Sequence, residues 1–142
     1  MSDAATNKAL FKDAFERWHE TKGGSVDHWM SIMADEIDFR SLAEGGGGLD
    51  FTARRRSKAE VGEYMGGLLA MFEMIHYKVD FLVAEDDRVI AVGSTSWRNR
   101  ETGATFDTPK ADIARFKDGK IVEFFEIYDT AAVQSCAGPP AA

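Results

Sequence analysis

Hydrophobic residues in the first half of the chain recur at helical spacing. Between residues 7 and 22 they stand three or four positions apart among charged residues, which predicts an amphipathic helix ended by the glycine pair 23–24. Ser25 is suited to cap a second, shorter helix. The capping box "SKAE" at residues 57–60 opens a third helix with hydrophobic residues along one side, and we expect it to run to about Met74.

The second half of the chain alternates between hydrophobic and polar residues, as strands do. Four long runs rich in β-branched and aromatic residues fill most of residues 75–129, and the short polar connections between them predict an antiparallel meander. A further strand is predicted for "EIDFRSL", residues 36–42, before a run of four glycines. The predicted fold class is α+β, a cone-like fold with three N-terminal helices packed on a curved, mixed but mainly antiparallel sheet.

Length and composition predict one domain with a hydrophobic core, since the chain has 142 residues, of which 44% are hydrophobic. We expect this domain to span residues 7–133, with disordered segments at 1–6 and 134–142. The formal net charge of −7 disfavours nucleic acid as a partner. Because there is no apolar run of 18 residues and no secretory signal pattern, we predict no membrane span and a cytoplasmic location. The single cysteine, Cys136, fits a reducing compartment.

The last two predicted strands each carry an acid among hydrophobic neighbours, Asp112 and Glu126. The register of their hairpin decides whether the two carboxylates share a face. We favour a three-residue loop at residues 117–119, which sets Asp112 opposite Phe124 and brings both acids to one face. The alternative two-residue turn sets Asp112 opposite Phe125. In the favoured register, the residues on the inner face are Asp112, Ala114, Phe116, Val122, Phe124, Glu126 and Tyr128.

The opposite face of this hairpin would carry Ile113, Phe125 and Ile127, which no predicted helix covers. A second copy of the chain could cover them, so we predict a homodimer through the outer face of the sheet. On an earlier strand, Trp97 and Arg98 must face opposite ways. Pro109 stands across from them and could mark a bulge, so which of the two faces inward stays open.

Two segments of the chain resemble the nuclear transport factor 2-like superfamily, which includes ketosteroid isomerase, the SnoaL-like polyketide cyclases and limonene epoxide hydrolase. They are "RWHETKGGSVDHWMSIMADEIDF" and "FKDGKIVEFFEIYDTAAV". A glycine-serine step before the second helix and Asp-Gly-Lys-Ile before a last strand ending in Tyr-Asp carry the likeness. The resemblance implies a cone-shaped α+β fold with a deep, mostly apolar pocket between helices and sheet, and it implies frequent dimers.

Carried over residue by residue, the resemblance is partial. The oxyanion-holding aspartic acid of the isomerase falls on Asp112 and an aromatic wall residue on Tyr64, but its general base falls on Ser41 and its helical tyrosine on Arg17. The last-strand acid of the hydrolase and of the cyclases falls on Glu126. The other members of the hydrolase triad fall near Gly93 and Thr95, which cannot replace them.

A carboxyl group inside an apolar cavity loses hydration of its charged form, which raises its pKa toward neutrality and suits it to proton transfer. A second interpretation is equally simple. Lys110 lies across from Glu126 in the favoured register, and a cross-strand ion pair would keep Glu126 ionised and inert. Both interpretations stay open at this point.

The function we predict is that of a SnoaL-like, cofactor-independent isomerase, cyclase or lyase that transfers protons on an apolar ring or carbonyl compound, with Glu126 and Asp112 as catalytic residues. The alternatives are a non-catalytic module that binds a hydrophobic ligand and a structural dimeric partner. No metal site is predicted, because the three histidines lack the pair spacing of metal ligands. The expected ligand contacts are Trp18, Phe39, Ser41, Tyr64, Lys110, Phe116, Phe124 and Tyr128.

Overall fold

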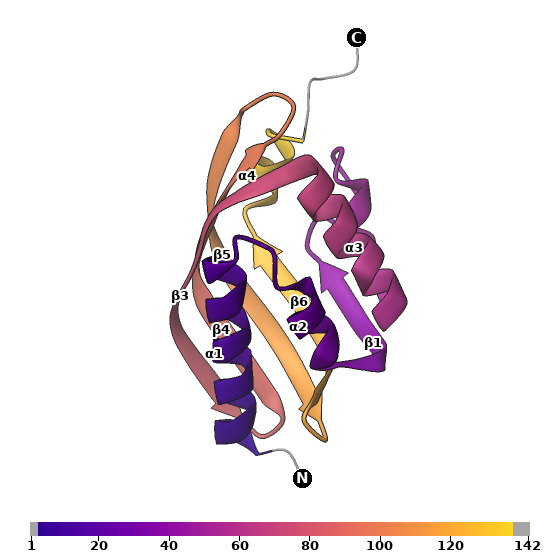
Figure 1. The fold of residues 1–142 in the computed structure, drawn as a ribbon, viewed down its shortest axis with the longest axis vertical. Coiled ribbons are helices and arrows are strands. Elements are labelled where there is room, and N and C mark those ends of the chain that lie inside the picture. Colours follow the sequence, from indigo (N-terminus) through magenta and orange to yellow (C-terminus); the bar gives the residue numbers. More distant parts are fainter. Residues whose placement is uncertain (1–2, 138–142) are drawn as a thin grey trace.

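The computed structural model describes residues 3–137 and consists of one mixed sheet with helices packed on one face (Figure 1). The α+β class is confirmed, although a short C-terminal helix adds to the three predicted ones. In chain order, the elements are α1 (Ala4–Glu20), α2 (Val26–Ser31), β1 (Met33–Ser41), the 3₁₀ turn η1 (Asp50–Thr52), β2 (Arg55–Ser57), α3 (Lys58–Met71), β3 (Phe72–Glu85), β4 (Arg88–Asn99), β5 (Thr105–Lys117), β6 (Lys120–Tyr128) and α4 (Thr130–Gln134).

The sheet has the strand order β2-β1-β6-β5-β4-β3. Strands β3 to β6 form the predicted antiparallel meander, and β1 joins β6 in parallel. Helix α1 packs against β3 and β4, while α3 packs against β1 and β2, so the two helices cover opposite halves of the concave face. The apolar sides of the helices and the inward residues of the strands therefore meet between the two layers.

The helix ends differ from the prediction in ways that local hydrogen bonds explain. Helix α1 begins at Ala4, three residues early, because Asp3 caps it by accepting from the backbone N–H of Thr6 at 2.8 Å. Helix α3 ends at Met71 because Phe72 already pairs with β4. Half of the capping box is confirmed, since Ser57 accepts from the Glu60 N–H at 3.2 Å.

Ser25 precedes α2 as predicted, but its side chain makes no capping hydrogen bond. The carboxylate of Glu60 accepts from the N–H of Arg56 at 2.7 Å rather than from that of Ser57.

The C-terminal boundary also differs from the prediction. Gln134 ends α4, and the buried Cys136 accepts at its backbone carbonyl from the Asn99 side chain at 2.8 Å. Residues 134–137 are therefore part of the fold. The disorder predicted for residues 1–2 and 138–142 lies outside the described residues, whereas residues 3–6 belong to α1 and its cap.

The hairpin between β5 and β6 has the two-residue turn of the alternative register, but beyond a bulge its pairing departs from both predicted registers. Its turn is the two-residue Asp118-Gly119, with φ angles of 52° and 77°, so the favoured three-residue loop was wrong. A bulge then leaves Val122 without a partner, and it shifts the pairing so that Asp112 lies directly opposite Glu126. Because the combined shift from the favoured register is two residues, both acids still face the same side of the sheet.

Strand β3 curves around the cavity because two bulges interrupt its pairing with β4, at Ile75 and at Asp80. Next to the second bulge, a Cβ on Gly93 would lie 1.8 Å from the carbonyl oxygen of Lys78, so only glycine fits there. Pro109 pairs with Ser94 in an unbroken ladder, and the bulge considered there is absent.

The regular pairing of β4 with β5 settles the direction of the neighbouring side chains. Trp97 faces the interior and is 3% exposed. Arg98 faces outward and donates to Glu73 at 2.7 Å.

Candidate functional site

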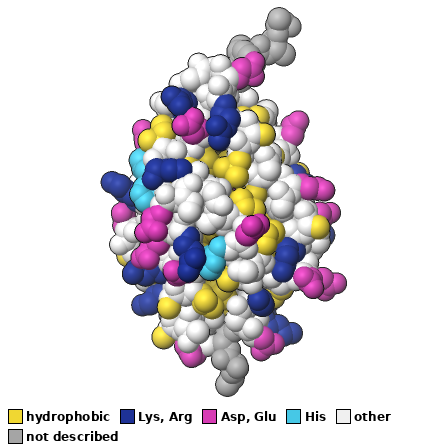
Figure 2. Space-filling view, in the orientation of Figure 1, with side chains coloured by type: hydrophobic (Ala, Val, Ile, Leu, Met, Phe, Trp, Pro, Cys, Tyr) yellow, Lys and Arg dark blue, Asp and Glu magenta, His cyan; other side chains and the backbone are white. Residues whose placement is uncertain are grey.

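The two layers enclose a cavity whose walls are largely aromatic. Its free volume is about 70 Å³, which is enough space for more than one water molecule. On the face drawn in Figure 2, hydrophobic side chains reach the surface in a strip between the positions of α2 and α3. The aromatic lining residues are Phe15, Trp18, Trp29, Phe39, Phe51, Tyr64, Phe72, Tyr77, Trp97, Phe106, Phe124 and Tyr128. The polar or charged ones besides the tyrosines are Thr52, Thr108, Lys110 and Glu126.

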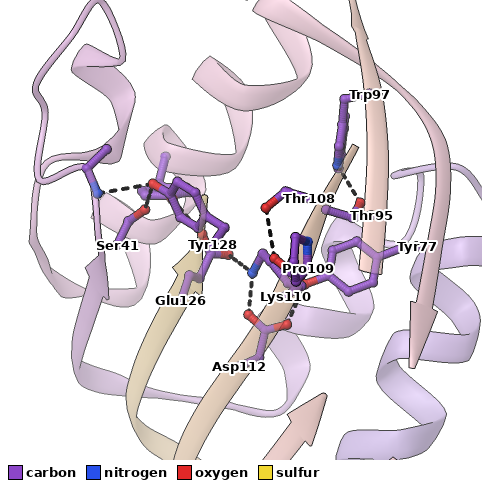
Figure 3. Close-up of polar contacts among 12 residues, drawn as sticks. Ser41, Tyr77, Thr95, Trp97, Thr108, Pro109, Lys110, Asp112, Glu126 and Tyr128 are labelled. Atoms are coloured by element: carbon purple, nitrogen blue, oxygen red, sulfur yellow. Dashed lines mark hydrogen bonds and ion pairs between the residues drawn. The ribbon is translucent and has the colours of Figure 1, made fainter. Parts of the chain in front are cut away.

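One end of the cavity carries three charged side chains from neighbouring strands, Lys110 and Asp112 on β5 and Glu126 on β6, which we call the inner cluster (Figure 3). The Lys110 ammonium contacts Oδ1 of Asp112 directly and lies 3.8 Å from Oε1 of Glu126. The exposed fraction of these side chains is 2% for Asp112, 8% for Lys110 and 18% for Glu126. Glu126 is therefore the acid that the cavity reaches, and Asp112 lies behind Lys110.

Glu126 is held between a phenol and the ammonium of Lys110. The hydroxyl of Tyr64 on α3 donates to its Oε2 at 2.7 Å. Burial raises the pKa of Glu126, and although the charge of Lys110 opposes this, the nearby carboxylate of Asp112 adds to it. The net result is a carboxyl group with a raised pKa, as the sequence predicted for an acid in an apolar cavity.

Lys110 has the opposite balance. Burial alone would lower its pKa, but the carboxylates of Asp112 and Glu126 outweigh that effect and raise it, so the side chain is an ammonium ion. Its Nζ also lies 5.5 Å from the ring centroid of Tyr77 and 5.8 Å from that of Tyr128. The ion pair predicted between Lys110 and Glu126 exists, but Lys110 stands opposite Tyr128 in the sheet and its nearer partner is Asp112.

Three tyrosines complete the polar end. The Tyr77 hydroxyl donates to Oδ2 of Asp112, so both carboxylate oxygens of Asp112 have buried partners. Tyr128 shares a hydrogen bond with the Ser41 hydroxyl and accepts from the N–H of Ala43 at 3.2 Å. Burial, reinforced by the neighbouring carboxylates, raises the pKa of Tyr64 and Tyr77 well above the usual value, so both remain hydrogen-bond donors.

The predicted site residues fall into two groups. Seven of them line the cavity: Trp18, Phe39, Tyr64, Lys110, Phe124, Glu126 and Tyr128. Three others lie behind that lining, at 1% or less overall exposure: Asp112 beneath Lys110 and Tyr77, Ser41 behind Tyr128, and Phe116 in the core against Phe11, with ring centroids 6.1 Å apart. Phe116 therefore packs the core rather than the cavity wall.

Sequence reasoning missed Tyr77, which follows the bulge at Ile75. Without that bulge, the alternation from Met74 would turn Tyr77 to the outer face, so the sequence pattern alone could not place it in the cavity. Sequence reasoning also missed Trp29, which lines the cavity. The amphipathic pattern of α2 predicts that this side chain is buried, but it does not predict that a cavity lies next to it.

Among residues 3–137, no group of three or more His, Cys, Asp or Glu side chains is placed to hold a metal ion. Within the same part of the chain, no helix is both long and apolar enough to cross a membrane. The predicted cytoplasmic location stays a prediction.

Comparisons with known proteins confirm the resemblance seen in the sequence. A family model of the SnoaL-like domain matches residues 11–124. A search of curated protein sequences gives no significant match. An NTF2-like protein from Burkholderia thailandensis E264 is 24% identical, with a TM-score of 0.79, and the alignment covers 97% of this chain and 100% of that one.

Two further solved structures with this fold hold small molecules. TerC, co-crystallised with polyporic acid, has a TM-score of 0.76 at 16% identity, and the alignment covers 93% of this chain and 98% of that one. A protein with a ketosteroid isomerase-like fold from Catenulispora acidiphila DSM 44928, in complex with trimethylamine, has a TM-score of 0.70 at 15% identity, covering 87% of this chain and 90% of that one.

Proposed function

The chain belongs to the SnoaL-like domain family, and on that premise we propose that its cavity binds an apolar ring compound with a carbonyl or hydroxyl group and catalyses proton transfer on it. The observation that carries this proposal is the position of Glu126. It combines access to the cavity with a raised pKa and an ammonium ion beside it. A base whose pKa lies nearer neutrality, next to a group that stabilises negative charge on oxygen, is what enolisation requires.

In the proposed reaction, ionised Glu126 takes a proton from the carbon next to a ring carbonyl. The electron pair of the broken C–H bond moves to the carbonyl oxygen, giving an enolate that Lys110 stabilises. Glu126 then returns the proton to another atom of the ring system, so the base is regenerated. A bound ring compound displaces water from the aromatic walls, which strengthens the interaction between the enolate and Lys110. Isomerases, cyclases and lyases of carbonyl compounds share this chemistry.

We assign Asp112 a different part from the one the sequence predicted. It lies behind the lining, and both of its oxygens already accept hydrogen bonds from Lys110 and Tyr77. It therefore positions Lys110 and balances its charge, while Glu126 carries the proton. The ligand-bound relatives support a cavity that accepts small organic molecules, since TerC was co-crystallised with polyporic acid.

Deuterium exchange tests this proposal without knowledge of the substrate. Cyclic ketones incubated with the protein in D₂O should exchange the hydrogens next to the carbonyl faster than in buffer, and NMR follows the loss of signal. Glu126→Gln should abolish the enzymatic exchange, because the amide cannot accept the proton. Glu123→Gln, on the outer face of the same strand, should leave it unchanged. Binding without exchange would instead favour the non-catalytic module.

We also propose that the outer face of the sheet forms a homodimer, the chain's partner being a second copy. Two hydrophobic rows cross four strands there, and no described helix covers them. At one end of the rows, Phe81 is 54% exposed and Val83 is 51% exposed. Pairing through the free edge of β3 is disfavoured, because bulges interrupt that edge. One row consists of Phe81, Val92, Ala111 and Ile127, and the other of Val83, Ile90, Ile113 and Phe125.

Light scattering tests the dimer. The wild type should show twice the chain mass of 15.7 kDa, and Ile113→Glu should halve it by placing a charge in the centre of the rows. Lys117→Glu, at the exposed end of the same strand, is the control and should remain dimeric. A monomeric wild type would contradict the proposal.

A further inference from the structure

The inner cluster presents an uneven set of charges to the cavity. Lys110 lines the cavity, but its closest counter-ion, Asp112, does not. Asp112 is also shielded by the Tyr77 hydroxyl on its other oxygen. A ligand at this end of the cavity therefore meets the ammonium ion directly and meets only one carboxyl group, that of Glu126.

Most other polar groups along the cavity are already engaged. Thr108 donates to the carbonyl of Pro109 at 2.9 Å and accepts from the N–H of Asp129 at 2.8 Å. Thr52 donates to the carbonyl of Leu49 at 2.6 Å and accepts from the N–H of Gly45 at 2.8 Å.

The indole N–H of Trp97 donates to Thr95 at 2.6 Å, and the Tyr64 hydroxyl donates to Glu126. The Tyr128 hydroxyl is already hydrogen-bonded to the Ser41 hydroxyl and to the N–H of Ala43. A polar atom of the ligand is thus directed to Lys110 and Glu126.

We propose that the site binds its ligand as an oxyanion, the phenolate or enolate of a ring compound with an acidic hydroxyl group, whose oxygen lies against Lys110 and whose proton passes to Glu126. The inference rests on the proposed function and narrows its substrate class. The O–H bond of the ligand breaks, its electron pair stays on the ligand oxygen, and the proton forms a new O–H bond with the carboxylate of Glu126.

The charge balance favours this class over two others. A phenol or enol brings its own proton, so binding moves one negative charge from Glu126 to the ligand oxygen without changing the total charge of the pocket. A carboxylic acid is already ionised in neutral solution and brings no proton for Glu126, so its carboxylate would add a second buried negative charge beside Glu126, which is costly. An ammonium ligand would meet the positive charge of Lys110 in the same low-dielectric space.

4-Nitrophenol tests the proposal directly, because its neutral and anionic forms absorb at different wavelengths. The bound probe should show the nitrophenolate band at pH values where the free probe is neutral, and its apparent pKa should fall by about 1–3 units, the usual effect of an adjacent opposite charge. 4-Nitroanisole has nearly the same shape but no acidic hydroxyl group, so it should bind more weakly and keep its spectrum.

Two variants assign the effect to Lys110. Lys110→Met should return the bound probe to its neutral band, whereas Lys117→Met, the same substitution at the exposed end of β5, should behave as the wild type. If circular dichroism shows that Lys110→Met does not fold, Tyr77→Phe replaces it; losing one hydrogen bond to Asp112 should reduce the pKa shift without abolishing it.

The outcomes separate the two proposals. Binding of both probes in neutral form would overturn the oxyanion inference but leave the ring-binding cavity in place. Binding of neither probe would overturn the inference, while ketone exchange in D₂O would still decide the proposed function. Preferred binding of an alkylammonium probe such as trimethylamine would overturn it in favour of a cation site.

Discussion

A cation between two carboxylates occurs twice around strands β5 and β6, once on each face of the sheet, although one carboxylate of the outer set, Asp87, comes from the turn between β3 and β4. The inner cluster has a lysine between two carboxylates. On the outer face, Arg115 donates to Asp87 and to Glu123, each at 2.9 Å, and we call these three residues the outer cluster. The side chains of the outer cluster are 38–44% exposed, whereas those of the inner cluster are 2–18% exposed. The comparison sets a buried and a solvent-exposed version of one charge pattern side by side, with lysine as the inner cation and arginine as the outer one.

Water determines which cause dominates the pKa values. In the inner cluster, burial is the largest single influence on the pKa of both Glu126 and Lys110; the charge of Lys110 opposes it at Glu126 while that of Asp112 adds to it, and at Lys110 both carboxylates oppose it. In the outer cluster, the pKa of Arg115 is raised chiefly by its hydrogen bonds to Glu123 and Asp87. A similar arrangement of one cation and two carboxylates thus gives surface ion pairs on one face and a group suited to proton transfer on the other.

The largest expected difference between the clusters is in stability. Lys110→Met leaves two buried carboxylates without their cation and should lower the free energy of unfolding by about 3–5 kcal/mol. Arg115→Met removes only exposed ion pairs and should cost at most about 1 kcal/mol. Urea denaturation at one protein concentration measures both. Equal losses would show that burial does not separate the two clusters.

The pH dependence of stability should distinguish the clusters next. Because the pKa of Glu126 is raised in the folded state, the unfolded chain loses this proton first as pH rises, from about 4.3 upward. The folded state then binds more protons than the unfolded state, so this residue lowers stability with increasing pH until the folded group also ionises.

Urea denaturation at a series of pH values rising from about 4.3, the ordinary pKa of a glutamate, should show this loss. It should be present in the wild type and in Glu123→Gln but absent in Glu126→Gln. A loss that persists in Glu126→Gln would assign the titration to another residue.

The smallest expected effect concerns the phenol that contacts Glu126. Tyr64→Phe removes a hydrogen bond that lowers the pKa of Glu126, so the pKa should rise further, and the variant should lose about 1–2 kcal/mol of stability. NMR titration of the carboxyl carbon reads the pKa directly. Tyr128→Phe is the matched control, since that hydroxyl bonds to Ser41 instead. An unchanged pKa in Tyr64→Phe would mean that the hydrogen bond is not maintained in solution.

Much of this fold follows from patterns that the sequence shows directly. The helical spacing before residue 22 and the alternation after residue 75 predict the two layers, because burial requires one apolar side in each kind of element. The shared face of Asp112 and Glu126 also followed, although the turn between them was wrong. The observed two-residue turn and its bulge together shift the pairing of the two strands by two positions relative to the predicted three-residue loop. Because side chains alternate between the faces of a strand, a shift of two positions leaves both acids on the same face.

The layering of the site could not be predicted in the same way. The bulges at Ile75 and Val122 have no recognisable signal in the sequence, yet the first turns Tyr77 inward and the second sets Asp112 opposite Glu126. Nor does the strand pattern say that the long side chain of Lys110 lies over Asp112 and separates it from the cavity. The position of Tyr77 and the order of Lys110, Asp112 and Glu126 depend on contacts between β3, β5 and β6, which only the folded chain brings together.

Gly93 shows how a residue outside the cavity can control its width. It stands between Val79 and Lys110 in the sheet, and the close approach of Lys78 leaves no room for even one methyl group. Any replacement of Gly93 would push β3 away from β4, and it would also move Tyr77, which forms part of the cavity wall on β3. Efforts to enlarge the site for bulkier molecules should therefore trim its aromatic lining and leave this glycine untouched.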